Sequence, residues 1–172
     1  RMVFQPHRYS RTKALSHWFA EEMSQVDDLQ FLPTYGAFEE YDSAGGVESL
    51  LGNLPPRLRK DSAVQEDFIE FYKAFEASKE SGRPEQMLFV GAGNIDRWAH
   101  AMAAMARSDG DRFRAFQFYL QDRVSVDCGL NEHESLGSKT TMRVGGAARW
   151  YAEPQNLIDL RTLIEGCNLL SV

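Results

Sequence analysis

A basic turn near the start of the chain carries the residues best suited to chemistry. His7, Arg8 and Arg11 lie in the stretch FQPHRYSRT, between a short apolar run and a helical pattern. Residues 1–20 together carry a charge of +4, whereas the whole chain carries −6. Two arginines three residues apart across a helix start can hold one anionic group through forked, charge-assisted hydrogen bonds. In an acidic chain this local positive charge suggests a specific anion site rather than a general nucleic-acid surface. The alternative is a solvated turn with a structural role only, which is the usual state of charged loop residues.

The turn GAGN, made of Gly91, Ala92, Gly93 and Asn94, is a second candidate. It follows an apolar run and precedes a helical pattern, so its backbone N–H groups suit an oxyanion at a helix N-terminus. A tight strand-to-helix turn without a ligand is an equally good interpretation. The turn lacks the third glycine of a dinucleotide fingerprint and an acidic ribose partner, which counts against a dinucleotide-binding oxidoreductase domain.

The remaining acidic and histidine residues form no complete catalytic machine. Glu39, Glu40 and Asp42 form an acidic cluster that is either a metal site or, more in keeping with its composition, a solvated loop. His133 between two glutamates is ambiguous in the same way. The chain has no Ser-His-Asp arrangement, no zinc-ligand spacing and no GxxxxGK[ST] loop. We therefore predict no catalytic and no metal-ligating residue in this chain.

Composition and charge narrow the class of protein. The chain has 172 residues, 43% of them hydrophobic and 26% charged, which is ordinary for a soluble globular protein. The negative net charge argues against non-specific binding of nucleic acid. No apolar run approaches the roughly 20 residues of a membrane span. Cys128 and Cys167 are isolated and lack metal-ligand spacing, which is typical of a reduced, cytoplasmic setting. The sequence starts in a strand-like segment without methionine, which predicts a fragment.

The order of the predicted elements indicates the fold class. Strands are predicted at residues 2–4, 29–32 and 87–90, and helices at residues 12–26, 62–80 and 95–107. Ser62 and Gln65 match a capping box at the start of the second helix, and the run MLFV predicts that the third strand is buried. The alternation of strands and helices predicts an α/β domain with a parallel sheet covered by helices over residues 1–107.

The character of the sequence changes after this domain. Residues 108–130 are a predicted linker, with an aromatic-rich stretch that fits a short helix or strand. Residues 131–172, with two strand-like segments (TMRV and ARWYA) and a short helix, form a small, incomplete α+β segment. So short a segment rarely closes a core without staples. We expect it to be mobile, to dock, or to form a homo-oligomer or domain swap, with Trp150, Leu160 and Leu163 exposed.

Three motifs of the first domain resemble the Mur ligases. FQPHRYSRT, YGAFE and FVGAGNI are similar to the C-terminal domain of UDP-N-acetylmuramate–L-alanine ligases, over about residues 1–107. The resemblance implies a Rossmann-like, three-layer domain of an amide ligase of peptidoglycan synthesis that uses ATP and Mg²⁺. The family's basic motif falls on His7, Arg8 and Arg11, which implies that they bind phosphate or carboxylate anions when the domains close. Residues 91–94 are implied to be a loop that faces the site.

A second resemblance covers the end of the chain. TTMRVGGAARWYAEP and the following NLIDLRTLI helix are similar to the start of UDP-N-acetylenolpyruvoylglucosamine reductases, which use FAD and NADPH. The two resemblances imply the junction of a cytoplasmic ligase–reductase fusion. The implied ligase substrates are UDP-N-acetylmuramate and L-alanine, although the sequence leaves glycine and L-serine open as the amino acid.

The resemblances also imply what this sequence lacks. The ATP-binding and UDP-sugar domains of the ligase lie outside it, as do the flavin-pyrophosphate loop and catalytic residues of the reductase. We therefore expect the chain alone to be inactive and to bind none of these cofactors tightly. The alternative from another class is a non-catalytic module that tethers two pathway enzymes, in which the basic turn is only structural.

Overall fold

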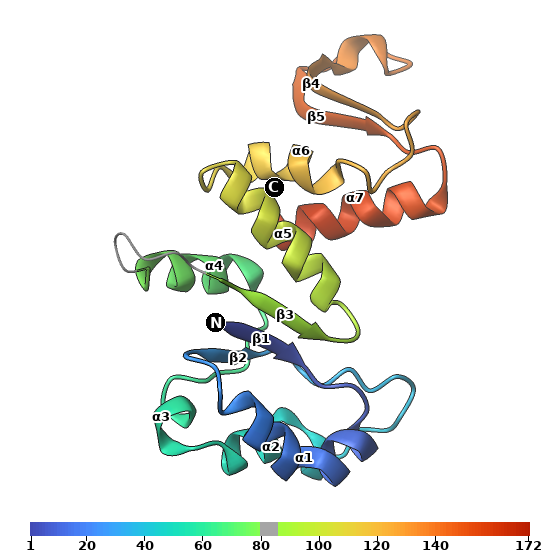
Figure 1. The fold of residues 1–172 in the computed structure, drawn as a ribbon. Helices are drawn as coiled ribbons and strands as arrows, with labels where there is room; N and C mark the ends of the chain where they lie inside the picture. Colours follow the sequence, from blue (N-terminus) through green and yellow to red (C-terminus); the bar gives the residue numbers. More distant parts are fainter. Residues whose placement is uncertain (80–85) are drawn as a thin grey trace. The chain divides into compact units, whose positions relative to one another are not determined.

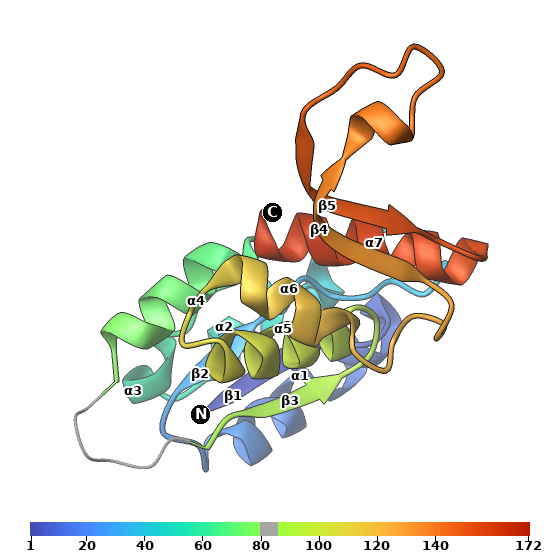
Figure 2. The ribbon, with the colours of Figure 1, turned by 90° about the horizontal axis from the view of Figure 1, so that it is seen from above.

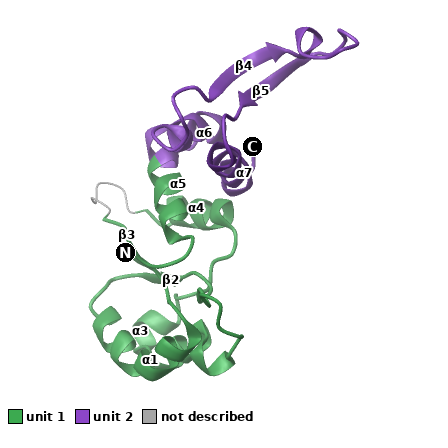
Figure 3. Ribbon diagram, turned by 90° about the vertical axis from the view of Figure 1, so that its right-hand side faces the viewer, with its two compact units in different colours: residues 1–103 green, residues 104–172 purple. Residues whose placement is uncertain are grey.

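The computed structural model describes residues 1–79 and 86–172, which form two compact units (Figure 3). Unit 1 comprises residues 1–103, and unit 2 comprises residues 104–172. None of the described helices combines the length and the apolar character needed to cross a membrane.

Unit 1 is built on a three-stranded parallel sheet. In the order β2-β1-β3, its strands are β1 (Met2–Gln5), β2 (Leu29–Phe31) and β3 (Leu88–Gly91). Phe4 of the central strand lies opposite Phe31 on one side and Val90 on the other. The predicted α/β class and parallel sheet are confirmed, and the central strand leads directly into the basic turn.

Helices cover both faces of this sheet, which gives three layers (Figure 1). One face carries α1 (Tyr9–Met23), α2 (Val47–Asn53) and α3 (Pro56–Arg59), and the other carries α4 (Phe68–Ala77) and α5 (Ile95–Arg107). On the first face, Phe4 and Phe31 share an apolar core with leucines of α2 and α3. On the second face, the ring of Trp98 packs against Phe68 and Phe71, each at a centroid distance of 5.4 Å.

Helix α1 begins at Tyr9, three residues earlier than the apolar spacing predicts. Thr12 is fully buried, and its N–H and hydroxyl both donate to the carbonyl of Arg8, at 3.0 and 2.8 Å. This side-chain bond closes the first turn, and apolar periodicity does not reveal it. Trp18, predicted on the apolar face, is exposed.

The start of helix α4 differs from the prediction because Ser62 does not cap it. The Ser62 hydroxyl donates to the carbonyl of Leu58. Asp67 caps the helix instead, accepting a hydrogen bond from the Glu70 N–H at 2.8 Å. The segment around Val64 lies beside β2, so the predicted first turn is extended chain. The helix end predicted near residue 80 lies outside the described residues.

Strand β3 is exposed, contrary to the prediction that it is buried. Leu88 and Val90 expose 46% and 40% of their surface, because β3 lies at the edge of the described sheet and pairs there with β1 alone. A continuous apolar run indicates a strand but does not show whether that strand is central or at an edge.

Unit 2 combines two helices with an antiparallel hairpin. Its elements are α6 (Arg112–Leu120), β4 (Gly129–Ser135), β5 (Ala147–Glu153) and α7 (Leu157–Leu170). The two helices pack side by side, and the turn end of the hairpin projects away from them (Figure 2). Gly166 of α7 lies against the rings of Phe116 and Tyr119, where a Cβ would approach them to 2.9 Å.

The structure changes how the end of the sequence is understood. Helix α6 lies within the predicted linker, and with its help the α+β segment has a buried core. Leu163 is buried and Trp150 is half-buried, so the prediction that both are exposed is wrong, whereas Leu160 is exposed. Residues 141–144, predicted as a strand, form part of the connection between β4 and β5, and the polar strand β4 was not predicted.

Asp159 fastens the start of α7 to the chain before β4. Its carboxylate accepts hydrogen bonds from the N–H and hydroxyl of Ser125, at 2.8 and 2.6 Å. The Gln155 N–H and the Asn156 amide donate to the same carboxylate, each at 3.1 Å. The hydrogen bonds from Ser125 are the main reason that the pKa of Asp159 lies below its ordinary value.

We expect this carboxylate to make unit 2 sensitive to acid. A carboxyl group with a lowered pKa in the folded state adds stability above its unfolded pKa, and this stability is lost as the pH falls through the folded pKa. The Tm of the chain, followed by circular dichroism, should therefore drop as the pH falls below the ordinary value of 3.8.

Asp159→Asn should lower the Tm at pH 7 by several degrees and make the transition less dependent on acid. Asp127→Asn provides the control, because Asp127 is an exposed carboxyl group from the same part of the chain. Equal Tm values for the two variants at pH 7 would contradict the assigned role of Asp159.

Candidate anion-binding site

The basic turn is held in place by the loop that follows β2. The Arg8 N–H donates to the Tyr35 carbonyl at 2.8 Å, and the Tyr35 N–H donates to the Pro6 carbonyl at 2.9 Å. The rings of His7 and Tyr35 stack, with centroids 5.9 Å apart and planes 17° apart. Tyr35 therefore holds the turn in two ways: backbone hydrogen bonds fix Arg8, and ring stacking fixes the His7 side chain.

Arg8 adopts a conformation that residues with side chains rarely occupy. It is the N-cap of α1, with φ 65° and ψ 135°, and its side chain makes no capping hydrogen bond. The bonds of its N–H to Tyr35 and of its carbonyl to Thr12 hold it there. Such a conformation costs about 1–3 kcal/mol and is found mainly at functional sites.

His7, Arg8, Ser10 and Arg11 line a shallow pocket of about 400 Å³. Within residues 1–79 and 86–172, neither the Arg8 nor the Arg11 guanidinium donates a hydrogen bond or forms an ion pair. Two guanidinium groups with available donors at one pocket suit a carboxylate or a phosphate, which each can bind in a forked arrangement. The structure thus brings the three predicted anion-binding residues together.

The other cations of the first 20 residues have acidic partners. Arg1 pairs with Asp28 at 3.4 Å, and Lys13 pairs with Asp42 at 3.1 Å. A hydrogen bond from the Ala44 N–H, followed by the one from Lys13, lowers the pKa of Asp42. The charge of +4 in the sequence is therefore partly balanced.

Glu39 occupies the start of helix α1. Its carboxylate accepts from the Ser10 hydroxyl at 2.6 Å and from the Ser10 N–H at 3.0 Å. These two bonds, with a smaller contribution from the charge of Arg8, lower the pKa of Glu39. The acidic loop, predicted to be solvated or metal-binding, thus supplies the capping group that the helix's own N-cap residue does not.

The glycine turn packs closely against the end of β1. A Cβ on Gly91, where φ is 141°, would lie 2.1 Å from the Gln5 carbonyl oxygen. A Cβ on Gly93, where φ is 91°, would lie 2.9 Å from the Tyr35 ring. Both positions need glycine, because a side chain would be strained and would clash. The close contacts place the predicted Gly91–Asn94 loop beside the basic turn.

Gln5 is a buried residue that connects the basic turn, the loop after β2 and the glycine turn, and no local sequence pattern predicts this role. Its side-chain oxygen accepts from the Ile95 N–H at 3.0 Å. Its side-chain nitrogen donates to Asn94 Oδ1 at 2.8 Å and to the Pro33 carbonyl at 3.1 Å. The first N–H of α5 is thus used internally, so the backbone donors of this turn are only partly available to a ligand.

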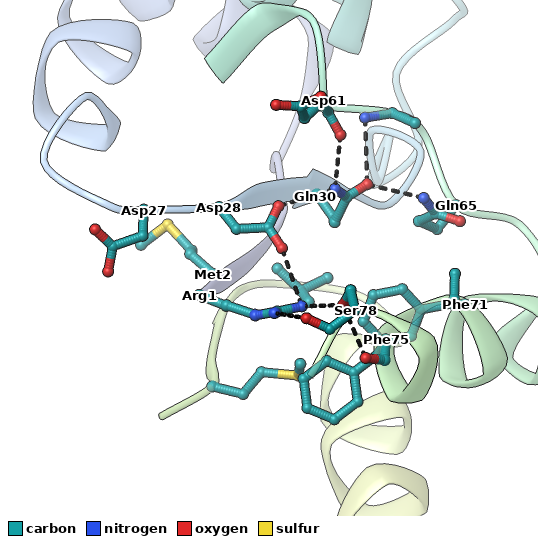
Figure 4. Close-up of a pocket in the computed structure, with 14 residues that line it drawn as sticks. Arg1, Met2, Asp27, Asp28, Gln30, Asp61, Gln65, Phe71, Phe75 and Ser78 are labelled. Carbon is teal, nitrogen blue, oxygen red and sulfur yellow. Dashed lines mark hydrogen bonds and ion pairs between the residues drawn. The ribbon is translucent and has the colours of Figure 1, made fainter. Parts of the chain in front are cut away.

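A larger pocket of about 450 Å³ lies at the opposite, amino end of the strands (Figure 4). Polar groups in it pair with one another: the Arg1 guanidinium donates to the Ser78 carbonyl at 2.9 Å, and Gln65 donates to Gln30 at 2.8 Å. Ligands of open α/β sheets bind outside the carboxyl ends of the strands. The basic pocket is therefore the better candidate.

Metal binding finds no support in the described ranges 1–79 and 86–172, where no three His, Cys, Asp or Glu side chains cluster. His133 is exposed on β4, with φ 53°. Within these ranges the candidate site therefore offers guanidinium groups and no cluster of metal-ligating side chains.

Comparison with known proteins supports the resemblance to the Mur ligases. No protein-family model matches the chain. Over 103 residues, 59% of the chain, it is 34% identical to UDP-N-acetylmuramate–L-alanine ligase of Hydrogenobaculum sp. (strain Y04AAS1). Part of the chain is therefore related to the Mur ligases. The match spans about a fifth of the ligase, 21% of its length.

Proposed function

We propose that unit 1 is the closing domain of an ATP-dependent amide ligase that joins L-alanine to UDP-N-acetylmuramate in peptidoglycan precursor synthesis. The observation that carries this proposal is that the Arg8 and Arg11 guanidinium groups meet at the pocket of the basic turn and donate no hydrogen bond to the residues that the structure describes. The partial identity to such a ligase supports the same assignment. The proposed setting is the cytoplasm.

In this proposal the chain's own residues bind and orient anions. ATP transfers a phosphoryl group to a carboxylate, which becomes an acyl phosphate while ADP leaves. The amine of the amino acid then displaces phosphate and loses a proton to form the amide. Arg8 and Arg11 hold a phosphate or carboxylate at the mouth of the pocket, and His7, fixed by Tyr35, donates to the same group. Because Tyr35 already holds the Arg8 backbone and the His7 ring, these two residues lose less freedom when an anion binds.

The residues that line the basic pocket fit an anionic group but not Mg²⁺, which prefers carboxylate and water oxygens. Two carboxylates of the acidic loop, Glu39 and Asp42, already accept hydrogen bonds from Ser10 and Ala44. We therefore assign Mg²⁺ and most contacts to ATP to other domains of the intact enzyme. The 172-residue chain alone is proposed to be inactive.

For unit 2 we propose the opening segment of a UDP-N-acetylenolpyruvoylglucosamine reductase fused to the ligase. The proposal rests on the resemblance of residues 140–164. Met142 and Val144 of this stretch are exposed, as expected of a segment that packs against further parts of a larger domain. FAD and NADPH are assigned to the intact reductase.

A non-catalytic tether between two enzymes is the alternative function. The observation that favours it is the division of the chain into two compact units at residue 103. A tether would need the two units but would not need the Arg8 and Arg11 guanidinium groups at the basic turn.

The deciding experiment measures phosphate release by the full-length polypeptide that contains this chain. Release that requires ATP, UDP-N-acetylmuramate and L-alanine together is the expected result. Glycine and L-serine in place of L-alanine then test the amino acid. If circular dichroism shows a folded protein and none of the three amino acids gives phosphate release, the ligase proposal is overturned and the tether is favoured.

A further inference from the structure

The donors at the start of α1 are already occupied by a carboxylate of the chain itself. Glu39 accepts both the N–H and the hydroxyl of Ser10, and Ser10 lines the same pocket as Arg8 and Arg11. The N-terminus of a helix is where an anionic ligand gains most from backbone donors and the helix dipole. Glu39 therefore sits where a bound anion would make part of its contacts.

The two residues that precede Glu39 in the loop have backbone conformations that cost free energy. Ala37 and Phe38 both have positive φ, 47° and 74°, and the Phe38 side chain is fully exposed. Side-chain-bearing residues pay for such conformations, and an exposed phenylalanine contributes little packing in return. The bonds from Ser10 to Glu39 are thus a main attachment of this part of the loop.

The charges around the pocket also favour replacement of Glu39 by a bound anion. Lys13 pairs with Asp42, whereas the two guanidinium groups line the pocket and the negative charge of Glu39 lies next to it, on the lining residue Ser10. A phosphate group can engage both guanidinium groups with several oxygens, whereas Glu39 reaches Ser10 with its two oxygens. A ligand with more negative charge therefore gains more from this site than Glu39 does.

We propose that Glu39 is an internal competitor of the anion site, and that a bound anion displaces it from Ser10 and releases the loop at residues 37–39. The inference rests on the proposed function of the basic turn. Because the binding-competent state is the one in which Glu39 has left, the measured affinity is the intrinsic affinity reduced by the fraction of that state. Glu39 thus lowers the measured affinity for every anion, and a weakly charged ligand does not displace it.

The test is a titration of the full 172-residue chain with pyrophosphate, followed by ¹H–¹⁵N NMR. In the wild type, the amide signals of Ser10 and of residues 37–39 should shift together, with one midpoint. Glu39→Gln, which keeps an oxygen that can accept from Ser10, should bind about threefold to tenfold more tightly, since one negative charge is removed. Asp42→Asn, the matched control from the same loop, should change the affinity less than twofold.

Two outcomes would overturn the inference while the proposed site stands. One is that Glu39→Gln binds no more tightly than Asp42→Asn. The other is that Ser10 shifts on binding while residues 37–39 do not. In both cases, loss of pyrophosphate binding in an Arg8→Ala/Arg11→Ala variant would show that the site itself is real. Failure of the wild type and of Glu39→Gln to bind would overturn both the inference and the proposed anion site.

Discussion

Replacing Gly91 by alanine should destabilise unit 1 by about 3–5 kcal/mol. Two effects add at this position. The backbone has φ 141°, which an L-residue adopts only with strain, and the new Cβ would lie 2.1 Å from the Gln5 carbonyl oxygen. That oxygen belongs to the central strand and cannot move away as the end of a flexible side chain could. Relief would require β3 to separate from β1, and the sheet would lose its edge.

Urea unfolding of the full chain, followed by circular dichroism, measures this effect as a shift of the transition that belongs to unit 1. Gly52→Ala is the matched control. Gly52 lies inside helix α2, with no atom within 4 Å of an added Cβ. Alanine there should stabilise by about 0.5–1 kcal/mol, because it is the better helix former. Similar midpoints for the two variants would show that β3 is not held against β1 as described.

The main parts of unit 1 could be predicted because local patterns determine them. Each of its strands is a short apolar run, and the helices between them require parallel pairing. The same reasoning places the basic turn and the glycine turn close together at the carboxyl ends of the strands, since each turn follows a parallel strand. His7, Arg8 and Arg11 meet at one pocket for this reason.

The supports of the site could not be predicted, because they depend on contacts between distant residues. Gln5 binds Asn94 across 89 positions of the sequence. Tyr35 stacks on His7 and lies against Gly93, although nothing in its local sequence indicates either contact. In the sequence Glu39 is only one of three neighbouring acids, since its role depends on where the loop returns to α1. Such contacts arise from the packing and not from periodicity.

Unit 2 shows a different limit. Strand β4 has the sequence GLNEHES, which lacks an apolar alternation because the hairpin is largely exposed. Helix α6 has its aromatic side chains on more than one face, so its period is unclear, yet Phe116 and Tyr119 form the core against α7. A small unit with so few buried residues leaves only a weak pattern in its sequence.

Removing both arginines of the basic turn should nearly abolish ligation by the full-length polypeptide. We expect Arg8→Ala/Arg11→Ala to lower kcat/KM by about 10²–10⁴, since hydrogen bonds between charged groups are the strong ones and both are removed. The measurement is phosphate release with ATP, UDP-N-acetylmuramate and L-alanine. Single variants should each fall between the wild type and the double variant.

Two controls separate chemistry from folding in this experiment. Arg8→Lys/Arg11→Lys keeps the charge but loses the forked geometry, so its activity should lie between those of the wild type and the alanine variant. Arg57→Ala removes an arginine of α3 that donates to the Val26 carbonyl at 3.2 Å, outside the basic pocket. It should keep its activity wherever the protein remains folded.

The outcome decides between the two functions proposed for the turn. Full activity in a folded Arg8→Ala/Arg11→Ala variant would reduce the turn to scaffold, because an anion site cannot lose both guanidinium groups and bind unchanged. The strained backbone of Arg8, with φ 65°, would then serve only the fold, through the bonds of its N–H to Tyr35 and of its carbonyl to Thr12. Loss of activity with an unchanged Tm would instead show that the side chains act on the substrates, which a purely structural turn does not predict.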